Sequence, residues 1–198
     1  MKQLLMVWRG TPMEMPAIPE GYRFHNWRRG GDEVLSAEAW REQWLDLHDP
    51  DHTQRETFIN WLPEVYDDTR VPDDGFFTVL TEENALVATA CIQLGEHTPE
   101  SATVHAVCAS REHKGKNLGR IVTVAVVEYA KRVGIDEVYL TTDDWRIPAV
   151  KIYLDLGFVP VYWDVDMRER WQKLFDLLGR RNVTVIDENG CDEIINAE

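Results

Sequence analysis

The segment TVHAVCASREHKGKNLGR, residues 103–120, is the most informative part of the chain about the fold, because a strand pattern in it passes through a short basic loop into a helix pattern. Residues 102–109 are rich in alanine and valine and predict a strand that runs up to the loop. After the loop, apolar residues recur with the spacing of one buried helical face, at Leu118, Ile121, Val122, Ala125, Val126 and Tyr129. The stretch therefore predicts a strand, a loop and a helix that ends at Gly134.

The loop has the features of an anion-binding site. Lys114, Lys116 and Arg120 are basic although the chain as a whole is acidic, and Gly115 and Gly119 let the backbone approach a ligand closely. Free N–H groups and the dipole at the start of the following helix favour a phosphate there. A tight turn with its lysines on a solvated face is the alternative interpretation, since neither a Walker sequence nor GxGxxG is present.

Strand patterns precede this segment. Residues 22–27 predict a strand closed by two glycines, and residues 75–80 and 85–94 predict a hairpin that turns at residues 82–84. With residues 102–109, the hairpin forms a meander of neighbouring antiparallel strands. The early part of the sheet is therefore expected to be antiparallel.

Two helices are expected between the first of these strands and the hairpin. Asp32 is a suitable cap for a helix that carries Trp40. A second helix is expected to start near Asp51 and to be kinked or ended by Pro63.

The two ends of the chain add strands and helices to this centre. Residues 1–8 predict a strand, and the chain beyond Gly134 predicts a strand at 136–141, a helix at 148–156, a strand at 158–165, a helix from Trp171 to Leu178 and a strand at 182–186. The fold class expected is α/β, a mixed and mainly antiparallel central sheet with flanking helices. A length of 198 residues suits one domain, with a core at about 21–165, an N-terminal strand extension at 1–20 and a C-terminal helix–strand extension at 166–198.

Composition excludes several classes of protein. The chain has 35 acidic residues against 21 Lys and Arg, a formal net charge of -14, which argues against nucleic acid as a partner. Three widely spaced cysteines predict neither a disulfide framework nor a metal site and suit a reducing cytoplasm. No stretch approaches the roughly 20 apolar residues that span a bilayer, and the first residues do not read as a signal peptide.

Two motifs resemble those of the GCN5-related N-acetyltransferases, the GNAT family. Residues 114–119 are similar to that family's [QR]-x-x-G-x-[GA] loop, with Lys114 and Asn117 as departures, and Asn tolerates a left-handed backbone better than most residues. Residues 149–158, AVKIYLDLGF, resemble its N-x-x-A-x-x-x-Y-x-x-x-G-F signature, with Arg146 where Asn is usual. The resemblance covers residues 75–163, about half of the chain.

The resemblance implies an acyl-CoA N-acyltransferase-like fold that binds acetyl-CoA between two splayed strands and needs no metal. The strand edge at Val107, Cys108 and Ala109 would pair with the pantetheine. The backbone N–H groups of the loop would hold the pyrophosphate, and the cofactor-binding residues expected there are Lys114, Gly115, Lys116, Asn117, Leu118, Gly119 and Arg120, with Arg146 added from the second motif.

The reaction implied is attack of a neutral amine on a thioester. An N–H near Val107 to Ala109 would stabilise the oxyanion, and Tyr153 matches the family tyrosine that acts as general acid. Tyr153 as a tyrosine packed in the core is the alternative. His105 is a candidate base and is expected on the same strand face as Val107 and Ala109; a packed histidine and a water relay stay open.

The acceptor of the acetyl group is expected to be an amine of a small molecule or protein. Residues 42–74 hold ten acids against Arg55 and Arg70, which favours a cationic acceptor, although acids that merely solubilise loops explain the pattern as well. A catalytically silent acyl-CoA-binding sensor or scaffold and an enzyme for longer acyl-CoA are the competing hypotheses. A homodimer is compatible with the sequence.

Overall fold

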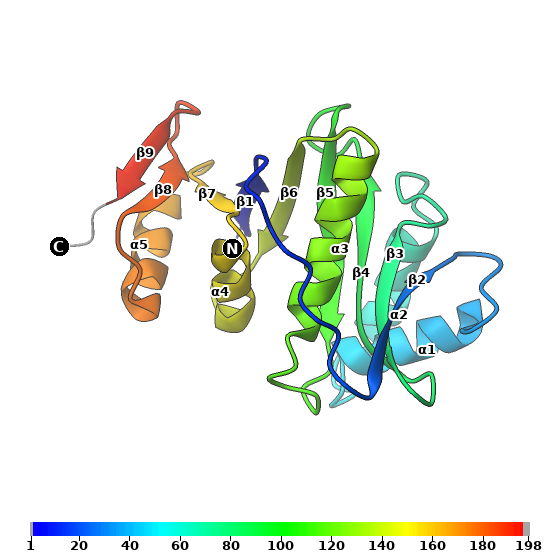
Figure 1. Ribbon diagram of the computed structural model, residues 1–198. Helices are drawn as coiled ribbons and strands as arrows, with labels where there is room; N and C mark the ends of the chain where they lie inside the picture. Colours follow the sequence, from blue (N-terminus) through cyan, green and yellow to red (C-terminus); the bar gives the residue numbers. More distant parts are fainter. Residues whose placement is uncertain (1, 196–198) are drawn as a thin grey trace. The chain divides into compact units, whose positions relative to one another are not determined.

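The computed structural model describes residues 2–195 and divides the chain into two compact units (Figure 1). The first unit is the segment Glu14–Ile135. The second combines the N-terminal residues up to Met13 with the residues from Asp136 onward. The predicted organisation as a single domain stays a prediction.

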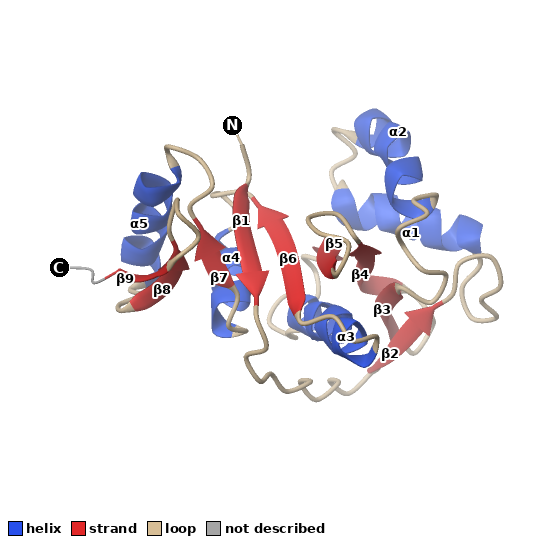
Figure 2. Ribbon diagram, turned by 90° about the horizontal axis from the view of Figure 1, so that it is seen from above, coloured by secondary structure: helices blue, strands red, loops and turns tan. Residues whose placement is uncertain are grey.

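The first unit is a four-stranded antiparallel sheet with helices on both faces (Figure 2). Its strands follow one another in space as in sequence: β2 (Tyr22–Trp27), β3 (Phe76–Thr81), β4 (Leu86–Leu94) and β5 (Ser101–Ala109). Helix α3 (Leu118–Arg132) lies on one face, and helices α1 (Ala37–His48) and α2 (Arg55–Tyr66) lie on the other. The predicted meander is confirmed.

Aromatic rings fill the space between the sheet and the two early helices. Trp27 of β2 stacks on Trp40 of α1 with 4.9 Å between ring centroids, and Phe76 of β3 meets Trp40 edge-on at 5.4 Å. All three side chains are fully buried. Because large aromatic side chains bury more apolar area than other residues, this cluster fixes α1 against the sheet.

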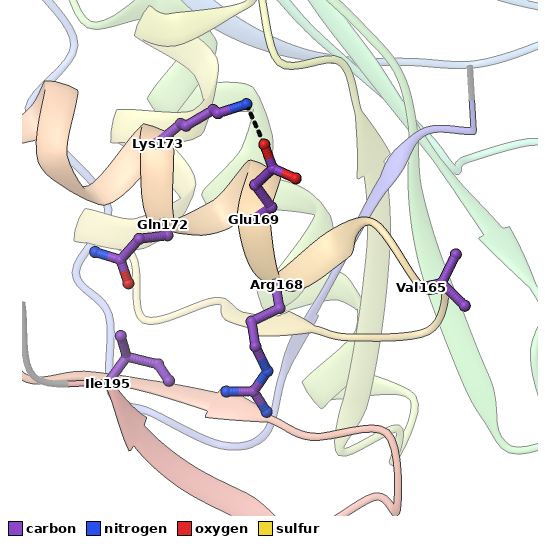
Figure 3. A pocket seen from close by; sticks show the side chains of 6 residues that line it. All are labelled: Val165, Arg168, Glu169, Gln172, Lys173 and Ile195. Atoms are coloured by element: carbon purple, nitrogen blue, oxygen red, sulfur yellow. Dashed lines mark hydrogen bonds and ion pairs between the residues drawn. The ribbon is translucent and has the colours of Figure 1, made fainter.

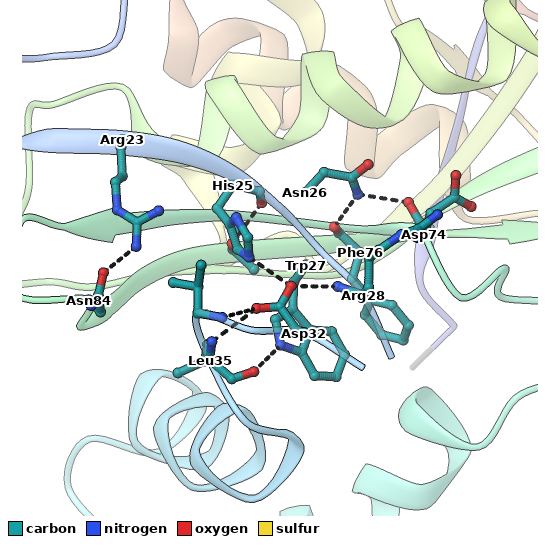
Figure 4. Close-up of polar contacts among 12 residues, drawn as sticks. Arg23, His25, Asn26, Trp27, Arg28, Asp32, Leu35, Asp74, Phe76 and Asn84 are labelled. Carbon is teal, nitrogen blue, oxygen red and sulfur yellow. Dashed lines mark hydrogen bonds and ion pairs between the residues drawn. The ribbon is translucent and has the colours of Figure 1, made fainter. Parts of the chain in front are cut away.

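The connection from β2 to α1 corrects the predicted helix start (Figure 4). Asp32 accepts hydrogen bonds from the N–H groups of Val34 and Leu35, both at 2.9 Å, and from His25 Nε2 at 2.8 Å. These partners hold Asp32 in a turn before the helix. The cap of α1 is Ser36, whose Oγ accepts the N–H of Ala39 at 3.2 Å.

Helix α2 differs from its prediction at its start, and of the two outcomes expected at Pro63 the helix does not end there. It begins at Arg55, because the carboxylate of Asp49 accepts the N–H groups of Thr53 and Gln54 and keeps residues 49–54 in a turn. It also continues past Pro63 to Tyr66. The carbonyl of Ile59 has no helical partner, because Pro63 lacks an N–H group. Both residues are exposed, so water can satisfy that carbonyl.

The second unit is a five-stranded sheet in the order β6-β1-β7-β8-β9. Strand β1 (Leu4–Trp8) is antiparallel to β6 (Glu137–Thr142) and to β7 (Val159–Val161). Strand β8 (Val183–Ile186) is parallel to β7 and antiparallel to β9 (Asp192–Ile195), a strand that the sequence did not predict. Helices α4 (Ile147–Asp155) and α5 (Met167–Leu178) complete the unit. The prediction of a mixed and mainly antiparallel α/β fold is confirmed, whereas the splayed strands stay a prediction.

Candidate active site

The loop between β5 and α3 has the backbone shape that anion binding requires. Gly115 and Asn117 both have positive φ angles, of 85° and 59°. Asn117 is the residue before the first turn of α3, and its side chain makes no capping hydrogen bond within the described residues. The left-handed conformation expected for Asn117 is therefore confirmed.

The start of α3 leaves backbone donors open. The first intrahelical bond runs from the N–H of Ile121 to the carbonyl of Asn117 at 3.0 Å, so helical geometry leaves the N–H groups of Leu118, Gly119 and Arg120 without an intrahelical acceptor. A Cβ built on Gly119 would meet nothing within 4 Å, so the space beside this backbone is open. Lys114 and Lys116 are exposed and Arg120 is half-buried, and their charges add to the positive end of the helix dipole. These residues fit a phosphate-bearing ligand.

Strand β5 carries a bulge that the sequence did not reveal. Cys91 pairs with His105, but Thr89 pairs with Cys108, so one extra residue of β5 lies opposite Ala90. Ala106 lies in this bulge and has a positive φ angle of 52°. Because cross-strand partners share a face, His105 lies on the same face as Cys108, and not with Val107 and Ala109 as simple alternation predicted.

His105 lies on the face of the sheet that α1 and α2 cover. Its ring is half-buried and meets the ring of Trp61 from α2 edge-on, with 5.6 Å between centroids. Burial lowers the pKa of His105, although the carboxylates of Glu96 and Asp68 oppose the shift. The imidazole is therefore neutral at pH 7, which is the form that can accept a proton.

Tyr153 lies on α4 of the second unit. Its side chain is 6% exposed and meets the ring of Phe158 edge-on, with 5.9 Å between centroids. Burial raises the pKa of Tyr153 to about 12, with Arg146 opposing the shift. The phenol is therefore protonated across the neutral range, as a general acid must be.

The glycine of the second motif closes α4 behind Tyr153. Gly157 has a φ angle of 82°, and the N–H of Phe158 donates to the carbonyl of Tyr153 at 3.0 Å. A Cβ at Gly157 would lie 2.7 Å from Cγ2 of Thr11. Both backbone conformation and space therefore require glycine at this position.

Arg146 is engaged within its own unit. It caps α4, its Nε lies 3.2 Å from Oδ2 of Asp143, and its guanidinium lies 4.8 Å from the centre of the Trp145 ring. The predicted site residues thus fall into both units. The first unit holds His105, Val107 to Ala109 and Lys114 to Arg120, and the second holds Arg146 and Tyr153.

Two open pockets lie outside the predicted site residues. One, of about 660 Å³, lies between α5 and β9, and its lining includes Lys173 in an ion pair with Glu169 (Figure 3). Arg168, also in its lining, forms an ion pair with Glu193. The other, of about 530 Å³, lies at the end of α2 and is lined by Pro63, Glu64, Asp67, Asp68 and Arg70. These acids belong to the acidic segment 42–74, from which a cationic acceptor is expected, but the sequence did not indicate that they line a pocket.

Asp68 is the most firmly held of these acids. Nη2 of Arg70 lies 2.8 Å from its carboxylate, and Nε2 of Gln93 from β4 also donates to it. Burial raises the pKa of Asp68, but the hydrogen bonds from Arg70 and Gln93 outweigh burial and hold the pKa at about 2. Asp68 is therefore a permanent negative charge on the face of the sheet that carries His105.

Within residues 2–195, no group of three His, Cys, Asp or Glu side chains is arranged to hold a metal ion. None of the helices described is long and apolar enough to cross a membrane. No disulfide joins the three cysteines within the described residues: Cys91 is buried, Cys108 half-buried and Cys191 exposed.

The chain is similar to several curated proteins over most of its own length. It is 28% identical over 174 residues to a mycothiol acetyltransferase of Thermobispora bispora, a match that covers 81% of this chain and 53% of that protein. A mycothiol acetyltransferase of Pseudarthrobacter chlorophenolicus is 37% identical over 73 residues, covering 37% of this chain and 22% of that protein. The chain spans about half the length of the curated relatives that it matches best in coverage.

Solved structures confirm the fold. A tandem GNAT protein from the clavulanic acid biosynthesis pathway superposes with a TM-score of 0.61 at 18% identity, covering 80% of this chain and 50% of that one. A GCN5-related N-acetyltransferase from Sphaerobacter thermophilus gives 0.59 at 18% identity, with coverages of 80% and 48%. The model of the acetyltransferase (GNAT) family matches residues 35–158, which is more than half of the sequence. With the loop before α3 and the glycine turn behind Tyr153 in place, this match identifies the chain as a member of the GNAT family of acetyltransferases.

Proposed function

We propose that the protein transfers the acetyl group of acetyl-CoA to an amine. The observation that carries the proposal is the loop before α3, where the left-handed Asn117 and the open N–H groups of residues 118–120 form an anion site inside the family match. The pyrophosphate of acetyl-CoA would bind to these groups, with Lys114, Lys116 and Arg120 supplying charge. The edge at Val107, Cys108 and Ala109 would hold the pantetheine.

The chemistry assigned to the residues is acyl transfer. The thioester supplies an activated acyl carbon; the nitrogen of a neutral amine attacks it, and the bond from carbon to sulfur breaks. His105 accepts the proton that the amine loses, and Tyr153 donates a proton to the departing thiolate. The low pKa of His105 and the high pKa of Tyr153 support these roles, because each group is then in the required form at pH 7.

Calorimetry with CoA and a thiol-release assay with acetyl-CoA test this proposal together. An enzyme binds CoA and releases free thiol when a suitable amine is present. A silent sensor or scaffold, the alternative, binds CoA but releases no thiol with any amine. Absence of CoA binding would refute both hypotheses, and faster release from longer acyl-CoA would reassign the acyl donor.

The acceptor proposed is cationic. Support comes from the pocket at the end of α2, where Glu64, Asp67 and Asp68 gather, and from the electrostatic influence of Glu64 and Asp68 on His105. An ammonium group of the acceptor would be attracted by these carboxylates. The amine panel should include neutral and cationic amines and the acceptor of the mycothiol acetyltransferases; rates that are equal for neutral and cationic amines and insensitive to salt would contradict the proposal.

Three further proposals concern the whole protein. A single domain is supported by a family match that runs from residue 35 to residue 158 and so includes residues of both units. A cytoplasmic location is supported by three cysteines that form no disulfide within the described residues. A homodimer is supported by the exposure of large apolar side chains, such as Val165 at 97% and Trp145 at 72%, and sedimentation would test it.

A further inference from the structure

The loop that precedes α3 is tied to the first strand of its unit. The hydroxyl of Tyr22 and Nδ1 of His113 are 2.7 Å apart, within hydrogen-bond distance. The two rings also meet edge-on, with 5.6 Å between centroids and 87° between planes. These residues are 91 positions apart in sequence, and both are half-buried.

Tyr22 is a rigid point of attachment. It is the first residue of β2 and pairs with Thr81, and β2 is paired with β3 along its whole length. The N–H of Tyr22 donates to the carbonyl of Pro19 at 3.2 Å, which fixes the backbone just before the strand. The backbone that carries the phenol is therefore held by the sheet and not by the loop.

His113, in contrast, belongs to the loop between β5 and α3, whose backbone is costly to order. The loop leaves β5 at Ser110, whose N–H donates to the carbonyl of Val87 at 2.8 Å, and enters α3 at Asn117. Between these points it contains two positive φ angles, at Gly115 and Asn117, which are costly to order. His113 directly precedes Lys114, so its attachment fixes the first residue of the anion-binding run.

A second tether of the loop is much weaker. Arg111 lies 3.6 Å from a carboxylate oxygen of Asp51, but the side chains are 76% and 72% exposed. Ion pairs with such exposure are screened by water and salt and contribute little to holding a segment in place. The contact with Tyr22 is shorter and partly shielded, so it dominates.

We propose that Tyr22 is a positioning residue that, through His113, holds the backbone of residues 114–120 in its anion-binding shape before the ligand arrives. The inference rests on the proposed function for the identity of that ligand, the pyrophosphate of CoA. A loop that is ordered before binding removes an entropic cost from binding. Loss of this order weakens the affinity without altering the contacts to the ligand. Tyr22 itself touches no reacting atom.

The test compares Tyr22→Phe with a matched control, Tyr129→Phe. Tyr22→Phe removes the hydroxyl and keeps the ring. Tyr129→Phe removes a comparable hydrogen bond in the same unit, from the phenol to Oδ1 of Asp74 at 2.9 Å. Tyr129 lies eleven residues beyond Leu118 on α3, about 16 Å from the loop end of the helix.

Hydrogen exchange without ligand and calorimetry with CoA are the two measurements. Tyr22→Phe is expected to speed exchange of the amides of residues 112–117 and to weaken CoA binding roughly fivefold, the loss that one hydrogen bond produces. KM for acetyl-CoA should rise while kcat stays unchanged, which is the result expected when the ground state and the transition state lose the same binding energy. Tyr129→Phe should leave both measurements as in the wild type. Adding His113→Phe to Tyr22→Phe should cause little further loss of CoA affinity, because the first substitution has already removed the hydrogen bond between the two side chains.

The outcomes separate this inference from the proposed function. Unchanged loop exchange and affinity in Tyr22→Phe would overturn the positioning role while acetyl transfer stands. Equal losses in Tyr22→Phe and Tyr129→Phe would also overturn it, because they would indicate a general loss of stability. Faster exchange in Tyr22→Phe with no CoA binding by the wild-type protein would overturn the proposed function and with it the ligand assigned to the loop.

Discussion

Replacing Gly157 with alanine tests why the turn behind Tyr153 requires glycine. The residue has a φ angle of 82°, and its missing side chain leaves room for Thr11. An added Cβ would lie 2.7 Å from Cγ2, 2.9 Å from Cβ and 3.2 Å from Oγ1 of Thr11. Distances below 3.0 Å do not occur between relaxed carbon atoms, so part of the turn or of the N-terminal segment must move.

Thr11 has little freedom to make way. Its carbonyl accepts a hydrogen bond from Nε1 of Trp8 at 2.8 Å, and the Trp8 side chain is 1% exposed. The left-handed backbone costs an alanine about 1–2 kcal/mol, and the overpacking costs a further 1–3 kcal/mol, roughly. Gly157→Ala is therefore expected to lower the free energy of unfolding by about 2–5 kcal/mol, a large part of the stability of a typical domain.

A double-mutant cycle separates the two contributions. In a Thr11→Gly background the close contacts vanish and only the backbone strain stays, so Gly157→Ala should then cost about 1–2 kcal/mol. Thr11→Ala removes Cγ2 and Oγ1 but keeps Cβ, and its rescue should be intermediate. Urea unfolding followed by tryptophan fluorescence gives each free energy, and an unchanged m-value shows that the same transition is compared.

Two results would refute this reasoning. A Gly157→Ala protein as stable as the wild type would mean that the turn relaxes without cost. A cost that is identical in the wild-type and Thr11→Gly backgrounds would mean that the contact with Thr11 has no influence and that backbone strain explains the whole effect.

Three further predictions concern the site and its charges. Tyr153→Phe should lower kcat by about 100-fold if the phenol is the general acid and leave the Kd of CoA unchanged; loss of CoA binding would make Tyr153 structural. Asn117→Ala should weaken CoA binding roughly fivefold while Asn117→Gly does not, because only the alanine resists the left-handed backbone; equal affinities by calorimetry would refute this. The pKa of Asp68 is lowered to about 2 from a usual 3.8, so its contribution to stability is complete above pH 4 and is lost as the pH falls towards 2. Thermal unfolding over this range should show a smaller acid loss in Asp68→Asn than in the wild type.

The parts of the fold that the sequence predicted well depend on local geometry. The buried face of α3 needs only the helical period, and the left-handed Asn117 follows from the backbone preference of that side chain. The start of α1 was predicted wrongly at Asp32, because Asp32 and Ser36 are both good caps and the contacts of Asp32 with His25, Val34 and Leu35 hold it in a turn before the helix. Strand β9 combines two acids with two isoleucines, a pattern without alternation, and it exists because β8 pairs with it.

The site itself was predicted as a set of residues but not as an arrangement. Tyr22 and His113 are far apart in sequence, and no motif joins them. Ala106 gives no sign of a bulge either, because the residue that usually marks a left-handed position in a strand is glycine. Both features arise from pairing between strands or between a strand and a loop, which a single sequence does not record.

The bulge at Ala106 changes which face of the sheet carries the candidate base His105. A regular strand would place His105 with Val107 and Ala109, but the extra residue places it with Cys108, on the face where Trp61 packs. Asp68, which influences the charge of His105, is bound to Gln93 of the neighbouring strand. The candidate base therefore faces the acidic residues proposed to attract the amine, while the end of the same strand leads directly into the basic loop proposed for CoA. A single strand thus separates the two opposite charge requirements of the proposed acetyl transfer, within a chain whose net charge of -14 would otherwise repel the phosphate-bearing cosubstrate proposed for it.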